Sequence, residues 1–115
     1  MDNEPTTKET RSEYPSGWLA LVKNESVGYI IDALMDLPPQ REFNQTELAE
    51  MAGVSRNSVG AHLQLLEELD LITEVEHTSP TRYRFNSTSE VSQALIQLEG
   101  AVNSTLVDDR TEAPA

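Results

Sequence analysis

Residues Asn44 to Ile72 read NQTELAEMAGVSRNSVGAHLQLLEELDLI, and the fold depends on this stretch. Asn44 with Glu47 three places later is the pattern of a capping box, in which two residues satisfy each other's backbone N–H groups at a helix start. Gly53 supplies the left-handed residue that most cheaply ends that helix. Ser55 can cap the next one. The stretch therefore predicts two short helices joined by a tight turn at Gly53.

The second of these helices has one apolar and one polar face. Val59, Leu63 and Leu66 recur at spacings of four and three, so this side is expected to be buried. Small and polar side chains form the outward face, at Asn57, Gly60, Ala61 and Gln64. Ala49 in the first helix is small enough to let the two helices cross closely.

A hairpin pattern follows the two helices. Leu71 to Glu76 and Arg82 to Phe85 alternate or are rich in β-branched and aromatic residues, with a polar turn between them. The alternative, an ordinary helical hairpin in an all-helical domain, does not account for these strands. With a further helix before it, the chain resembles a small winged helix-turn-helix transcriptional regulator of the ArsR-like and MarR-like kind. Its acidity suggests a haloarchaeal member.

The resemblance is specific over residues 44 to 86 and looser over 18 to 103. It implies a mainly α fold with a small β-hairpin wing and extra N- and C-terminal helices. In such proteins the second helix of the motif enters the major groove and the wing touches the DNA backbone or minor groove. Carried over by position, the expected recognition-helix contacts are Ser55, Arg56, Asn57, Ser58, Gly60, Ala61, His62 and Gln64, and the expected wing contacts are Arg82 and Arg84.

Several of these positions allow a second interpretation. Gly60 and Ala61 stand where many relatives have larger polar or basic residues, so direct base readout is expected to be sparse. Asp70 occupies a turn where Gly is common. Arg56 is expected to contact phosphate, with an ion pair to Glu50 or Glu67 as the alternative. His62 suits either a phosphate contact or a buried structural hydrogen bond, and Tyr83 and Phe85, which alternate with the wing arginines, are expected to face the core.

The length of 115 residues allows one domain with tails. We expect a disordered N-terminal tail over 1–17, a winged helix-turn-helix domain with a terminal dimerisation helix over 18–103, and a disordered acidic tail over 104–115. Within the domain, Ser26 to Leu37 predicts a helix that Pro38 and Pro39 stop, preceded by a short extra helix at Trp18 to Val22. Residues expected to pair two chains are Trp18, Val91, Leu95, Leu98 and Val102. The alternative is that the last helix covers its own domain.

The formal net charge of −12 has the wrong sign for meeting phosphate. Acids are nevertheless absent from Met51 to Leu66 and from His77 to Ser89, the segments expected to face DNA. Six Arg against two Lys, with this acidity, suits a cytoplasm of molar salt, where the Debye length is about 3 Å and repulsion from phosphate is largely screened. The alternative is a mesophilic acidic protein whose winged helix binds another protein.

Other classes of function lack their patterns. The chain has no Cys, which excludes disulfides and thiolate metal sites. Its two His have neighbours unlike a metal site or a nucleophile-base pair, and it has no apolar run of the roughly 20 residues that cross a bilayer. We therefore expect a cytoplasmic homodimer, without enzymatic activity, cofactor or metal, that binds double-stranded DNA sequence-specifically at promoters. The alternative is a protein-protein adaptor in a transcription or plasmid-maintenance assembly, and no pattern identifies a small-molecule effector.

Overall fold

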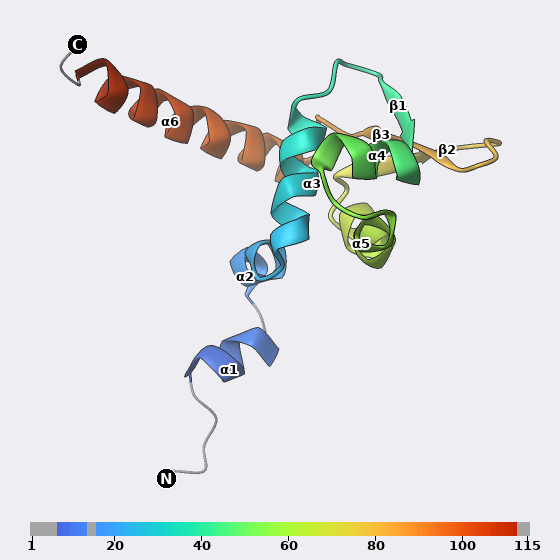
Figure 1. Ribbon diagram of the computed structural model, residues 1–115, viewed down its shortest axis with the longest axis horizontal. Coiled ribbons are helices and arrows are strands. Elements are labelled where there is room, and N and C mark those ends of the chain that lie inside the picture. The colour runs from blue at the N-terminus through green and yellow to red at the C-terminus, as the bar shows by residue number, and fades with distance from the viewer. Residues whose placement is uncertain (1–6, 14–15, 113–115) are drawn as a thin grey trace, which may run out of the picture.

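The computed structural model describes residues 7–13 and 16–112 of the 115. Helices and a small sheet alternate along the chain (Figure 1). In chain order they are α1 Thr7–Glu13, α2 Gly17–Val22, α3 Glu25–Met35, β1 Glu42–Asn44, α4 Gln45–Ala52, α5 Arg56–Glu68, β2 Ile72–Val75, β3 Arg82–Phe85 and α6 Glu90–Glu112. The three strands form one antiparallel sheet in the order β1-β3-β2. This mainly α fold with a β2-β3 hairpin wing is the predicted one.

The predicted ends of α4 and α5 are all present. Asn44 Oδ1 accepts the N–H of Glu47 at 2.8 Å, and Glu47 Oε1 accepts the N–H of Asn44 at 2.9 Å, which closes the capping box. Gly53 ends α4 with φ 72°, and Ser55 Oγ accepts the N–H of Ser58 at 3.0 Å to start α5. Asp70 adopts φ 58° in the turn before β2, the left-handed conformation that Gly supplies more readily. Local sequence chemistry therefore decides where the motif starts, turns and stops.

The third strand, β1, was not predicted. It pairs with β3 so that Phe43 lies opposite Tyr83, and both side chains are buried with their ring centroids 6.3 Å apart. Because neighbouring residues of a strand point to opposite faces, Glu42 and its partner Arg84 lie on the other face of the sheet. β1 thus places an acidic residue beside the wing arginines.

The core lies between α3, α4, α5 and the inner face of the sheet. α3 contributes four buried residues, ends before Pro38 as expected, and packs on α4 and α5. In α5, Val59 and Leu66 are fully buried and Leu63 is half-buried, which confirms the predicted stripe. The buried hydrophobic residues are Val27, Ile30, Ile31, Leu34, Phe43, Leu48, Ala49, Val59, Leu66, Leu71, Ile72 and Tyr83.

The ends of the chain differ from the sequence prediction. Thr7–Glu13 is helical where disorder was expected, since it contains several good helix formers and neither Gly nor Pro. Gly17–Val22 is the expected short extra helix. α6 continues to Glu112 instead of ending near 103, because Leu106 extends the apolar stripe and neither Gly nor Pro interrupts residues 101–112. Residues 1–6, 14–15 and 113–115 of the predicted tails lie outside the described residues.

The molecule has an open shape, because α1 stands apart from the body and α6 projects from it after its first turns (Figure 1). The radius of gyration is 17.1 Å, compared with about 13 Å for a compact domain of this length. Within the described residues, no helix combines the length and apolarity needed to span a membrane.

Candidate nucleic-acid interface

The first half of α5 presents most of the predicted contact residues on one exposed surface. Six of them are exposed and two, Ser58 and His62, are half-buried. The exposed ones are Ser55, Arg56, Asn57, Gly60, Ala61 and Gln64. The hydroxyl of Ser55 is already engaged, since it caps α5 and lies 3.0 Å from Ser58 Oγ. Arg56, Asn57 and Gln64 are the longer polar side chains on this surface, and Gln64 Nε2 also donates to Glu68 Oε2 at 3.4 Å.

Arg56 is held by the start of α4 and not by an acidic residue. Its Nε donates to Thr46 Oγ1 at 3.1 Å, and its backbone carbonyl accepts the side-chain amide of Gln45 at 3.0 Å. None of the ion pairs among the described residues includes Arg56, so the alternative pairing with Glu50 or Glu67 is not formed. Sequence reasoning missed Gln45 and Thr46, whose contribution depends on the packing of α4 against α5.

A polar hollow of about 310 Å³ lies where α4 and α5 begin and the wing approaches them. Its lining consists of Asn44, Gln45, Thr46, Arg56, Pro80, Thr81 and Tyr83. Between residues 42 and 89, Arg56 is the basic residue without an acidic partner. A hollow that combines hydroxyl and amide groups with one unpaired guanidinium suits an anionic group such as phosphate.

The small residue at position 60 has a structural reason. A Cβ added to Gly60 would lie 2.8 Å from Nε2 of Gln45, the atom that also donates to the carbonyl of Arg56. The absence of a side chain at this position thus lets Gln45 join the two helices. The consequence is a smooth patch on the exposed face of α5, formed with Ala61.

The wing arginines, which the sequence predicts to contact DNA, lie beside acidic side chains of β1 and α4. Arg84 Nη2 lies 2.9 Å from Oε2 of Glu42. Arg82 Nε lies 3.3 Å from Oε1 of Glu42, and its Nη2 lies 3.2 Å from Oε1 of Glu47. Both arginines are on the outer face of the sheet, opposite the buried Tyr83, as the alternation indicated. Their charges, however, are matched by two carboxylates that lie outside the acid-free segments of the sequence.

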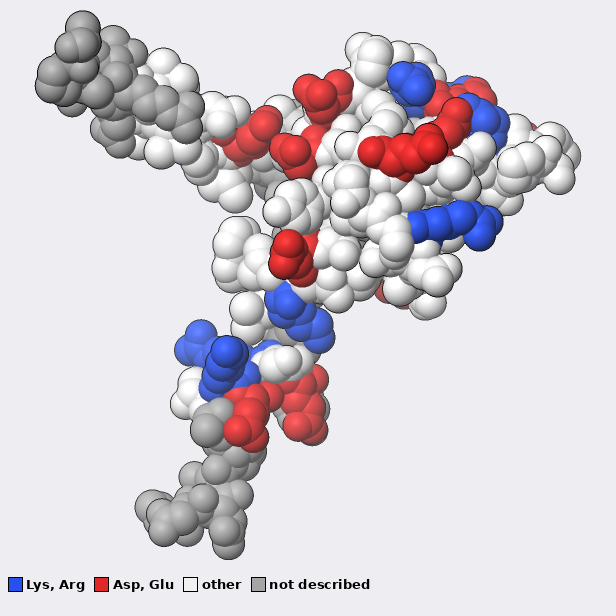
Figure 2. Space-filling model, viewed as in Figure 1, with Lys and Arg blue, Asp and Glu red and all other residues white. Residues whose placement is uncertain are grey.

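Acidic and basic side chains are intermixed around β1 and the start of α4, as Figure 2 shows for one face of the molecule. The acid-free segment from His77 to Ser89 is therefore not an acid-free surface, because Glu42 and Glu47 reach it from other elements. The projecting part of α6 carries no charged side chain from 100 to 107 (Figure 2). The two regions differ in chemistry and suit different partners.

The histidines do not form a reactive site. His62 is half-buried on α5, and His77 is exposed in the wing turn with φ 63° and 4.0 Å from a carboxylate oxygen of Glu76. No cluster of three or more side chains suited to a metal ion occurs among the residues that the structure describes.

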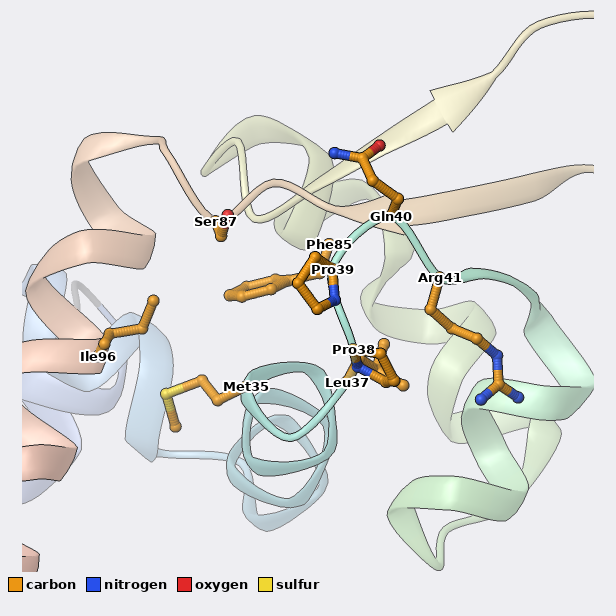
Figure 3. A pocket seen from close by; sticks show the side chains of 9 residues that line it. All are labelled: Met35, Leu37, Pro38, Pro39, Gln40, Arg41, Phe85, Ser87 and Ile96. Carbon is orange, nitrogen blue, oxygen red and sulfur yellow. The ribbon is translucent and has the colours of Figure 1, made fainter.

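A second hollow, of about 170 Å³, lies between the end of α3, the loop after it and the first half of α6 (Figure 3). Its walls combine apolar and polar groups, and the side chain of Arg41 points away from it in Figure 3. The lining residues are Met35, Leu37, Pro38, Pro39, Gln40, Arg41, Phe85, Ser87 and Ile96. The volume is close to that of a cavity that holds one benzene ring, about 150 Å³. Without a charged group directed inward, the hollow does not define the chemistry of a ligand.

The predicted dimerisation residues are partly brought together. Trp18, Leu95 and Leu98 line an apolar groove of about 240 Å³ between α2, α3 and α6. Val91 packs against the core of its own domain. Val102 lies further along the projecting part of α6, where 46% of it is exposed, and Leu106, one turn on, is 41% exposed.

Comparison with known proteins places this fold. No family model matches the sequence. No curated protein matches it either. The crystal structure of NolR from Sinorhizobium fredii is similar with a TM-score of 0.55 at 22% identity, over 89% of this chain and 96% of the NolR chain. The likeness shows a shared winged-helix fold, which confirms the predicted fold class, whereas the ArsR-like or MarR-like kind and the haloarchaeal origin stay predictions.

Proposed function

We propose that this protein is a double-stranded DNA-binding transcriptional regulator without enzymatic activity, acting in the cytoplasm as a homodimer. One observation carries the proposal: the exposed start of α5 adjoins a polar hollow in which Arg56 has no acidic partner. The start of α5 would enter the major groove, with Arg56 on a phosphate and with Asn57 and Gln64 at base edges. The fold shared with NolR is a winged helix, a fold that presents one helix to the major groove, which supports the same function.

Homodimerisation is supported by the exposed apolar surface of α6. A helix standing in solvent is marginal unless its apolar face is packed, yet Leu98, Val102 and Leu106 are each more than two-fifths exposed. These residues continue into the groove that Trp18 and Leu95 line. A second copy offers the same uncharged stripe, so two chains would cover each other's α6. The paired α5 helices would then meet half-sites about one helical turn apart.

Binding at molar salt accounts for the sparse positive charge. Counterion release is a weak driving force when salt is already concentrated. Shape fit, water and a few base-edge contacts would carry specificity instead, in keeping with the small Gly60 and Ala61 on the exposed face.

The pairing of the wing arginines with Glu42 and Glu47 favours a second candidate function. With its wing neutralised, the winged helix suits docking on another protein as an adaptor in a transcription or plasmid-maintenance assembly. This candidate needs no unpaired cation at position 56.

Selection of bound fragments from genomic DNA at molar KCl tests the proposal. We expect a palindromic sequence to be enriched, and Arg56→Gln to weaken binding to it by roughly tenfold, as for loss of one charged phosphate contact. Lys23→Gln is the matched control, because Lys23 is an exposed cation at the end of α2, away from α5 and the wing (Figure 1). Failure to enrich any fragment would favour the adaptor function. An equal loss of DNA affinity in Arg56→Gln and Lys23→Gln would show that Arg56 does not contact DNA.

A further inference from the structure

The guanidinium of Arg82 joins three elements of the winged helix at once. Arg82 belongs to β3, the central strand of the sheet, and its Nη2 donates to the backbone carbonyl of Glu42 in β1 at 3.1 Å. The same Nη2 contacts the carboxylate of Glu47 in α4. We propose that Arg82 is a positioning residue, which sets the wing against the start of α5 and does not itself contact DNA. The DNA-binding readout of this inference rests on the proposed function.

The contact reaches the cap of α4 through Glu47. Its Oε1 accepts both the backbone N–H of Asn44, at 2.9 Å, and the guanidinium of Arg82, at 3.2 Å. Asn44 Oδ1 in turn accepts the N–H of Glu47. The carboxylate that starts α4 is therefore the one that holds the wing strand.

The first turn of α4 is also hydrogen-bonded to α5. Gln45, next to Asn44, donates its side-chain amide to the carbonyl of Arg56, and Thr46 accepts from the guanidinium of Arg56. Hydrogen bonds thus lead from the wing strand, through residues 44 to 47, to the first residue of α5. A shift of Arg82 would move the wing relative to the side chains proposed to meet DNA.

Thr78 fixes the wing turn to the same strand residue. Its hydroxyl donates to the carbonyl of Val75 at 2.8 Å and accepts the backbone N–H of Arg82 at 2.9 Å. The backbone of Arg82 is thereby tied to the turn, while its side chain is tied to the body of the domain. The position of the tip and the position of the guanidinium are coupled through one residue.

Charge and exposure argue against a direct phosphate contact by this residue. Glu42, Glu47, Arg82 and Arg84 together carry no net charge, and the Arg82 side chain is 32% exposed. A phosphate would have to compete with the carboxylates that already contact Nε and Nη2 of Arg82, next to their negative charge. Partly buried pairs are screened by salt less than exposed ones, so this arrangement also persists at high ionic strength.

The salt dependence of DNA affinity separates positioning from phosphate contact. Each phosphate contact contributes about 0.9 to the slope of log affinity against log salt. We expect Arg82→Gln to weaken binding roughly tenfold because it leaves Glu47 unpaired, with the slope unchanged. Adding Glu47→Gln, which keeps a side chain able to form the capping box, should restore most of the affinity. Arg56→Gln is the matched control and should lower the slope by about 0.9.

The position of the wing can be measured without DNA. The chain has no native Cys, so spin labels can be attached to single introduced cysteines. Spin labels on Ser79→Cys in the wing turn and Glu68→Cys at the end of α5 report the distance, with labelled chains diluted in unlabelled ones. We expect Arg82→Gln to broaden the distance distribution and the double variant with Glu47→Gln to narrow it again. A distribution that Arg82→Gln leaves unchanged, or a slope lowered by about 0.9 in both Arg82 variants, would overturn the positioning role. If the wild-type protein bound no DNA, the proposed function would fail while the distance result still decided the inference.

Discussion

The side-chain amide of Gln45 in α4 occupies the space beside Gly60 in α5, where a Cβ would lie 2.8 Å from Nε2. The same Nε2 donates to the carbonyl of Arg56 at 3.0 Å. The contact fastens the start of α4 onto the helix proposed to read DNA. It also explains a glycine within a helix, where Gly is less stable than Ala by about 1 kcal/mol.

A double-mutant cycle tests this contact. Gly60→Ala gains about 1 kcal/mol of helix propensity but displaces Gln45 and its hydrogen bond, which is worth about 1 kcal/mol. We predict almost no change in the free energy of unfolding for Gly60→Ala alone, and stabilisation by about 1 kcal/mol when it is added to Gln45→Ala. Urea unfolding at one fixed protein concentration measures both. Equal stabilisation in the two backgrounds would show that Gln45 and Gly60 are not coupled.

The dimer surface is tested by a charge on each side of α6. Val102 belongs to the exposed apolar stripe, whereas Ser104, two residues on, lies on a different face of the helix, about 200° away at 100° per residue. We predict that Val102→Glu yields monomers, because a carboxylate buried between two helices would lose its hydration. Ser104→Glu should remain dimeric at the same concentration. Sedimentation equilibrium gives the mass, and a monomeric wild-type protein would contradict the proposed pairing.

Alkaline pH should destabilise the fold through Tyr83. Burial raises the pKa of Tyr83 above its ordinary 10.0, with smaller contributions from the charges of Glu67 and Glu74. The unfolded chain therefore loses this proton first, so the contribution to stability is complete below pH 10 and is lost as pH rises through the higher pKa of the folded state.

Unfolding free energies from pH 9 upward measure this loss. Tyr83→Phe should flatten the decline above about pH 10. Tyr29→Phe is the control, because Tyr29 is 53% exposed, and it should leave the decline as in the wild type. Parallel curves for all three proteins would exclude Tyr83 as the titrating group.

High salt should support both folding and DNA binding. The chain carries a net charge of −12, so its self-repulsion is relieved as the Debye length falls to about 3 Å at 1 M salt. We predict that the melting temperature rises as KCl is increased from 0.1 M to about 1 M, the range over which salt screens the charges of the chain. Specific DNA affinity should persist at molar KCl. Loss of the fold at molar KCl would contradict the halophilic interpretation.

Local chemistry made the helix-turn-helix predictable. Asn44, Glu47, Gly53 and Ser55 act within a few residues of themselves, and each adopts the cap or turn that its residue type favours. The surface proposed to contact DNA followed from the same helix periodicity, which put Asn57 and Gln64 outside and Val59 inside.

Contacts between distant segments were not predictable in this way. β1 has three residues, too few for a strand pattern, and without it the pairing of Glu42 with Arg84, 42 residues apart, has no signature. The sequence therefore gave no sign that Arg82 and Arg84 have acidic partners. The length of α6 was missed for a different reason, since its final turns carry the polar residues typical of a tail.

Hydrogen exchange with and without an enriched duplex tests the central claim most directly. If the winged helix binds DNA, amides over residues 55–64 and 76–82 should exchange more slowly in the complex, and those of α3, which face the core, should not change. Protection confined to α2 and α6, or absent throughout, would contradict a DNA interface formed by α5 and the wing.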